Sequence, residues 1–221
     1  MVNSRRSAWS QALDGAPLTA GILASCALCT LTAWYGPPQA YRALVPSTSD
    51  GPWLMAIGLL TSALVHGDLF HIVFNGFWVL DIGTRIERAR GMRSVLLFSV
   101  VAAMFSGTVQ WMSTGRLGIG YSGVVYALVG WAWASPLTRM PQAHLAARRA
   151  MPLLFLWGLV CIGFTLNGSM AVANGGHFGG LGIGVAIGAC TGASWARRAG
   201  VMVLLCVGAV MWVTVARQVG F

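Results

Sequence analysis

A serine and a histidine, far apart in the chain, each stand among glycines at the start of an apolar run. Ser122 lies in Gly120-Tyr-Ser-Gly123, and His177 lies in Asn174-Gly-Gly-His-Phe-Gly-Gly180. A serine hydroxyl is a weak nucleophile until a neighbouring base takes its proton, and histidine is the usual base near neutral pH. We therefore interpret Ser122 as a candidate nucleophile for acyl transfer and His177 as its general base.

A third polar cluster can supply hydrogen-bond donors to the oxyanion that acyl transfer creates. His71 and Asn75 follow His66 at the entry to another apolar run, and their four-residue spacing places them on one face of a helix. An oxyanion is stabilised by fixed donors. We expect the Asn75 amide, a His71 ring N–H and the Ser122 backbone N–H to provide them, with His66 hydrogen-bonding the loop around the site.

The sequence offers no acidic partner to orient His177. Asp68 is the only acidic residue expected near these helix ends, so a Ser–His dyad is favoured over a triad. Packing must then hold the imidazole ring. Tyr126, one helical turn after Ser122 on the same face, is the candidate to stack on His177.

Composition indicates that lipid is the solvent for most of the chain. Of its 221 residues 57% are hydrophobic and 9% are charged, against about 25% charged in ordinary soluble domains. The net charge is +9 and every basic residue is arginine, but the arginines fall in short clusters between apolar runs. This pattern favours membrane orientation over nucleic-acid binding. The expected fold class is all-α, a polytopic transmembrane helix bundle.

Seven apolar runs approach the roughly 20 residues that a helix needs to cross a bilayer. They are about 18–36, 69–86, 94–112, 117–136, 150–166, 174–195 and 199–216. The connection 37–68 is rich in proline and contains a semi-apolar stretch, 53–64, expected to lie partly in the membrane interface. The predicted organisation is a cytoplasmic segment (1–17), a six-helix core (18–195) and an additional C-terminal helix (196–221).

The arginine distribution predicts the orientation of these helices. With a cytoplasmic N-terminus, eleven arginines lie inside and three lie outside, as the positive-inside rule requires. The second, fourth and sixth helices then run from outside to inside. Their polar starts meet in one layer near the outer surface of an inner (plasma) membrane. The residues expected in this layer are His71, Asn75, Ser122 and His177.

Glycine placement supports a recessed site. Gly118 and Gly120 are expected to delay the fourth helix until about Ser122, inside the apolar run. Non-helical backbone at membrane depth is tolerated where it lines a water-filled cavity. Glycines recur every four residues in the sixth helix, from Gly176 to Gly192, and this stripe predicts a close approach of the fourth helix.

These motifs together resemble the rhomboid family of intramembrane serine proteases. His66, His71 and Asn75 resemble the second-helix HxxxxHxxxN motif of that family, residues 120–123 resemble its GxSG motif, and residues 173–180 resemble its final histidine motif. Gly83, Glu87 and Gly91 also match. The resemblance covers about residues 50–195. One departure is the first outer loop, where Trp53 is not followed by the arginine found in many members.

The resemblance implies a function and a set of roles. Ser122 would be the nucleophile and His177 the base, with His71, Asn75 and the Ser122 backbone as the oxyanion hole. The supporting residues would be Tyr126, Gly120, Gly123 and His66. The implied activity is hydrolysis of a peptide bond near the outer end of transmembrane helices of other membrane proteins. No cofactor or metal is implied, and the sequence does not indicate an oligomeric state.

Three other functions compete with this interpretation. A catalytically silent relative that binds and escorts membrane proteins would usually lack Ser122 or His177, and both are present. A metal enzyme could use three histidines, but no HExxH motif accompanies them. A transporter could use the intramembrane Asp81, but Arg85 at i+4 offers that carboxylate a structural ion pair.

Overall fold

The structure, a computed structural model, describes residues 14–47 and 49–219, and these form helices joined by loops, without a strand. The predicted all-α class is confirmed. The expected N-terminal segment 1–17, with Arg5 and Arg6, lies mostly outside the described residues. In chain order the elements are α2 (Pro17–Tyr35), α3 (Pro38–Leu44), α4 (Pro52–Thr61), η1 (Ser62–Leu64), α5 (Leu69–Trp78), η2 (Val79–Gly83), α6 (Thr84–Arg90), α7 (Met92–Thr114), α8 (Ser122–Ala134), α9 (Pro141–Leu166), α10 (Asn174–Cys190) and α11 (Trp195–Val219).

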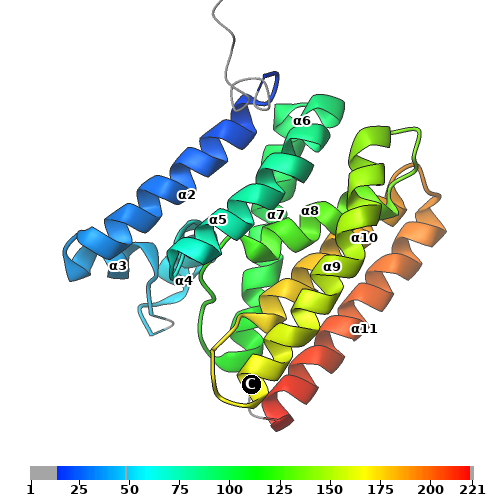
Figure 1. The fold of residues 1–221 in the computed structure, drawn as a ribbon. Coiled ribbons are helices and arrows are strands. Elements are labelled where there is room, and N and C mark those ends of the chain that lie inside the picture. Colours follow the sequence, from blue (N-terminus) through cyan, green and yellow to red (C-terminus); the bar gives the residue numbers. More distant parts are fainter. Residues whose placement is uncertain (1–13, 48, 220–221) are drawn as a thin grey trace, which may run out of the picture.

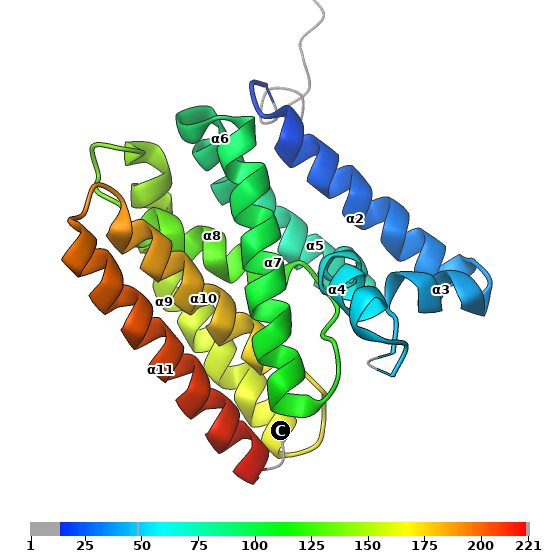
Figure 2. The same ribbon diagram turned by 180° about the vertical axis from the view of Figure 1, so that it is seen from behind.

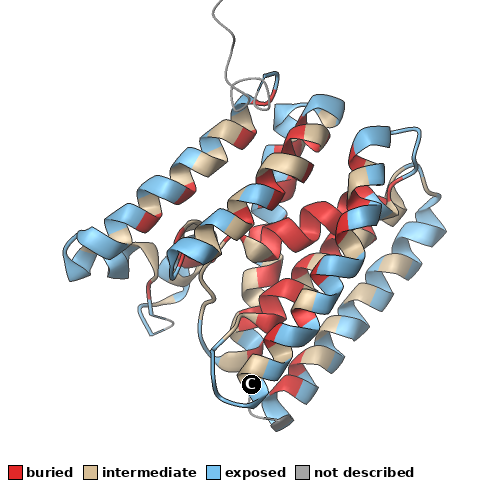
Figure 3. Cartoon of the chain, in the orientation of Figure 1, coloured by how far each residue is buried: buried red, intermediate tan, exposed pale blue. Residues whose placement is uncertain are grey.

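The helices pack around α8, which lies in the middle of the bundle (Figures 1 and 2). Helices α7, α9 and α10 surround it, while α2 stands at one edge of the molecule and α11 at the other. Every residue of α8 from Gly123 to Ala132 is buried, and Figure 3 shows this helix almost entirely in the colour of buried residues. A helix that is apolar on all sides is stable only when it is enclosed in this way.

Helix α8 is too short to cross a membrane. Its 13 residues span about 20 Å at 1.5 Å per residue, against a hydrocarbon core of about 30 Å. Its first residue, Ser122, therefore starts the helix inside the bundle. The predicted delay of the helix until about Ser122 is confirmed.

Glycines of α10 bring its backbone against α8. A Cβ atom at Gly180 or Gly184 would overlap the carbonyl oxygens of Gly123 and Ala127, and one at Gly188 would lie 2.6 Å from the Trp131 carbonyl oxygen. The predicted close approach of the fourth helix to the glycine stripe is confirmed at Gly180, Gly184 and Gly188. The two outer positions differ, since Gly176 faces α7 and Gly192 follows the end of α10 with positive φ.

Four of the described helices are long and apolar enough to cross a membrane: Pro17–Tyr35, Met92–Thr114, Pro141–Leu166 and Trp195–Gln218. The pair Pro52–Leu64 and Leu69–Arg90, bent by 87°, could form one more span or a re-entrant loop. Two predicted spans, 117–136 and 174–195, are thus shorter helices inside the bundle. The predicted semi-apolar stretch 53–64 is helical, but it turns sharply away from the helix that follows.

Several helices extend beyond their predicted limits, and α9 does so by the most. The second predicted span, 69–86, continues to Arg90 through a π-helical turn at Val79–Gly83. The fifth, predicted over 150–166, begins at Pro141, because proline suits a first helical turn whose N–H groups have no partner inside the helix. Asp81 pairs with Arg85 at 2.9 Å, as its spacing predicted.

Glu87 fixes α6 to the start of α2. Its carboxylate accepts hydrogen bonds from the backbone N–H groups of Leu18 and Thr19 at 2.8 and 2.7 Å, and from the Thr19 hydroxyl at 2.6 Å. These are first-turn amides that lack partners within α2. A buried carboxylate at a helix N-terminus is also favoured by the helix dipole.

Candidate active site

Ser122 reaches the bundle interior through a loop that needs glycine. Gly120 has φ +103°, and a Cβ atom there would collide with the His71 ring. Its N–H donates to the Ser62 carbonyl oxygen at 3.2 Å, which ties the loop to the start of η1. The next two residues lead directly into α8. No side chain among the described residues caps this helix, and the first N–H groups of a helix have no partner within it.

The Ser122 hydroxyl and the His177 imidazole lie within hydrogen-bond distance, with Oγ and Nε2 2.9 Å apart. His177 stands in the first turn of α10 and is 5% exposed. The two residues come from helices whose backbones touch. A Cβ atom at Gly123 would lie 3.2 Å from the Gly176 carbonyl oxygen. Close helix packing therefore sets the separation of the pair.

Tyr126 lies flat against the His177 ring. The ring centroids are 4.6 Å apart and the planes differ by 7°. The Tyr126 hydroxyl donates to the Leu154 carbonyl oxygen of α9 at 2.7 Å, which fixes the far end of the side chain. The expected stacking is present. The buried Nδ1 atom of His177 has no hydrogen-bond partner among the described residues, so ring packing holds the imidazole.

His71 and Asn75 face the same space from α5. Asp68 caps this helix by accepting from the His71 N–H at 2.8 Å. The Asn75 side-chain Nδ2 donates to the His71 carbonyl oxygen at 2.9 Å, which orients the amide. His71 Nδ1 accepts from the Gly67 N–H at 3.4 Å, an arrangement that leaves the ring proton on Nε2.

His66 is buried beneath the site instead of facing it directly. Its Nε2 atom accepts from the Tyr121 N–H at 3.3 Å, and its Nδ1 atom lies 3.3 Å from the Thr30 hydroxyl. The Trp34 indole donates to its carbonyl oxygen at 2.9 Å. His66 therefore links α2 to the residue before Ser122, which agrees with the predicted contact to the surrounding loop.

Gln110 also belongs to the site but was not singled out from the sequence. It is 6% exposed, and its Oε1 atom accepts from the Gly176 N–H at 3.2 Å in the turn that carries His177. One signal was present in the sequence. Gln110 is the single amide side chain in the apolar run of α7, and a buried amide needs hydrogen-bond partners.

A cavity of about 700 Å³ connects these residues and is lined by Ser122, His177, His71, Asn75 and Gln110 among others. Aromatic side chains form part of its wall between α5 and α9. The Trp157 ring lies 5.6 Å from Phe74 and 6.4 Å from Phe70. Among the residues that the structure describes, no three His, Cys, Asp or Glu side chains are grouped to hold a metal ion.

The long apolar helices and the short helix enclosed among them define a multi-pass helical membrane protein. The family model of the Rhomboid domain matches residues 54–194 of the chain. The chain is also similar to the Rhomboid protease GlpG of Serratia proteamaculans (strain 568), with 32% identity over 179 residues, which cover 76% of this chain and 60% of that protein. It therefore belongs to the rhomboid family. It spans about three fifths of the length of that relative.

Proposed function

We propose that this protein is an intramembrane serine endopeptidase that cleaves transmembrane helices of other membrane proteins near their outer ends. The observation that carries the proposal is the contact between Ser122 Oγ and His177 Nε2 in a cavity within a membrane-embedded bundle. Membership of the rhomboid family and the similarity to a protein named as a protease support it.

The proposed reaction begins with proton transfer from Ser122 to His177. The hydroxyl oxygen attacks the scissile carbonyl carbon while Nε2 takes the hydroxyl proton. The 2.9 Å separation is suitable for this transfer. His177 then gives the proton to the leaving amine, and the peptide bond breaks to leave an acyl group on Ser122.

Three donors are proposed to hold the oxyanion. Asn75 Nδ2 has two N–H bonds, and only one is needed for the His71 carbonyl oxygen. Asn75, His71 and Ser122 all line the cavity, and the proposed donors are this second N–H, the His71 Nε2–H and the Ser122 backbone N–H. Because these groups are fixed before the reaction starts, they stabilise negative charge without reorganisation.

Hydrolysis of the acyl group repeats the sequence with water as the nucleophile. His177 takes a proton from water, the resulting hydroxide attacks the ester carbonyl, and the proton returns to Ser122 Oγ as the carboxylic product leaves. The cavity volume of about 700 Å³ is enough for a peptide segment and water.

The proposed substrates are transmembrane helices that unwind easily. An intact helix keeps its carbonyl groups in backbone hydrogen bonds, so a segment rich in glycine or other small residues is expected near the cleavage site. We propose the inner (plasma) membrane as the location, with a cytoplasmic N-terminus, six core helices and an additional C-terminal helix.

A cell-based cleavage assay tests the proposal. Ser122→Ala should abolish release of a fragment from a tagged single-pass substrate while leaving the protein in the membrane. Among the described residues, Ser122 carries the hydroxyl that lies within hydrogen-bond distance of the His177 ring. A fluorophosphonate probe should label the wild type and not this variant. Ser135→Ala is the matched control, since Ser135 is buried at the opposite end of α8.

The same assay separates the proposal from a silent escort function. An escort protein would retain substrate binding and show no fragment with either the wild type or Ser122→Ala. Undiminished cleavage by Ser122→Ala would exclude the serine mechanism. Loss of cleavage on chelation, restored by zinc, would favour metal-dependent chemistry instead.

A further inference from the structure

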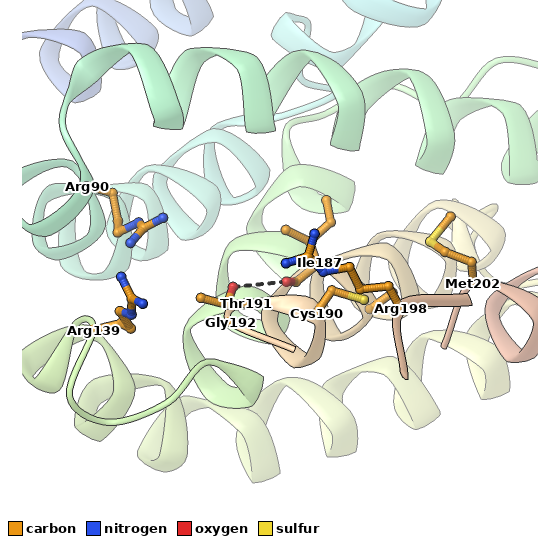
Figure 4. Close-up of a pocket in the computed structure, with 9 residues that line it drawn as sticks. Arg90, Arg139, Ile187, Cys190, Thr191, Gly192, Arg198 and Met202 are labelled. Carbon is orange, nitrogen blue, oxygen red and sulfur yellow. Dashed lines mark hydrogen bonds between the residues drawn. The ribbon is translucent and has the colours of Figure 1, made fainter. Parts of the chain in front are cut away.

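A second cavity, of about 410 Å³, lies at the end of the bundle where the predicted cytoplasmic arginines gather. Arg90 comes from the end of α6, Arg139 from the loop before α9, and Arg198 from the first turns of α11. Figure 4 shows the guanidinium groups of Arg90 and Arg139 pointing toward one another, with the Arg198 side chain extending toward the same space. Three separate segments thus deliver positive charge to one cleft.

Of the residues that the structure describes, none that lines this cleft is acidic. Asp81 is paired with Arg85, and Glu87 is engaged by Leu18 and Thr19. The Nε atom of Arg90 is buried and has no hydrogen-bond partner among the described residues. Like charges repel at close range and a buried donor costs free energy when it is unmatched, so the cleft is built for an anion.

Membrane orientation alone does not require this arrangement. Arg148 and Arg149 also add positive charge on the predicted cytoplasmic side, and both are exposed on α9 outside the cleft. The three cleft arginines instead share one cleft with the apolar side chains of Ile187 and Met202. Beyond Met202, α11 presents exposed apolar side chains such as Val203, which would face lipid.

We propose that this cleft binds the phosphate of an anionic phospholipid, with the acyl chains lying along α11. Guanidinium groups match phosphate oxygens with paired hydrogen bonds. Basic pockets between transmembrane helices on the cytoplasmic side suit such head groups. A lipid fits better than free phosphate because the apolar part of the cleft continues into the lipid-facing surface of α11. The bound lipid would join α11 to the loop before α9 and to α6.

Native mass spectrometry of the full chain in detergent tests this assignment. The protein is titrated with phosphatidylglycerol and, separately, with phosphatidylcholine of the same acyl chains. Phosphatidylglycerol should bind more tightly, and the double variant R139Q/R198Q should lose about tenfold or more of that affinity, the scale for two charge-assisted contacts. The matched control is R148Q/R149Q, which removes the same charge from exposed positions on the same side and should bind like the wild type.

Three results would overturn the proposal. Equal weakening in both double variants would show that binding follows net charge. Equal binding of the two lipids would remove the role of the anionic head group. Displacement of phosphatidylglycerol by millimolar inorganic phosphate would assign the cleft to a soluble anion. Near-native elution from a sizing column would show that R139Q/R198Q is folded, so this test stands apart from the protease proposal.

Discussion

The amide of Asn75 provides the sharpest residue-scale prediction. Asn75→Ala should lower kcat by about 10²–10³-fold with a small change in KM, because the donor is proposed to act mainly on the oxyanion of the transition state. The measurement is cleavage kinetics of a purified transmembrane substrate. Asn167→Ala is the control, since Asn167 lies at the exposed end of α9.

The alternative role of Asn75 is structural, because its amide also holds the His71 carbonyl oxygen. If that were its sole role, loss of the amide would reduce substrate affinity and turnover together, or lower thermal stability without a selective effect on kcat. Such a result would remove Asn75 from the proposed oxyanion hole.

At the scale of elements, the contact between α8 and α10 decides whether the serine and histidine meet. Gly184→Ala should reduce stability by about 1–3 kcal/mol, the usual cost of overpacking, since the added Cβ would overlap the Ala127 carbonyl oxygen and backbone cannot move aside as a side chain can. Activity should fall as well, because the forced separation widens the Ser122–His177 contact. Thermal unfolding in detergent and the cleavage assay measure the two effects.

Gly163→Ala is the matched control for the helix contact. Gly163 lies in α9 and a Cβ atom there would meet nothing within 4 Å. This variant should be as stable as the wild type or slightly more stable, because alanine favours the helix. Equal losses in both variants would show that the close approach of α8 and α10 is not the cause.

For the whole molecule, the arginine bias predicts which end of α9 faces the cytoplasm. Gln142→Cys and Ser169→Cys place thiols at exposed positions near the two ends of this helix. A membrane-impermeant maleimide applied to intact cells should label Ser169→Cys above the native background and leave Gln142→Cys unlabelled until the membrane is opened. The reverse pattern would invert the proposed orientation and put the active site on the inner side.

The sequence determined the membrane environment, the all-α class and the chemical identity of the site residues, because each depends on local composition. A chain with so few charges must bury its surface in lipid. Glycines at positions 118 and 120 limit where α8 can begin, and Tyr126 shares a face with Ser122 through helical periodicity. These properties are encoded within a few residues of where they act.

The tertiary structure decided how closely the predicted segments approach and which further segments join them. Helices α8 and α10 appeared as full spans in the hydropathy pattern, yet they are short elements enclosed by their neighbours. Gln110 contacts the backbone beside His177 across a separation of 66 residues, and three arginines converge on one cleft from α6, the loop before α9 and α11. An apolar pattern specifies that a helix face is buried, but not which helix it packs against. That partner depends on the shapes of the side chains across the bundle. For α10, the glycines that permit close backbone contact make α8 the partner.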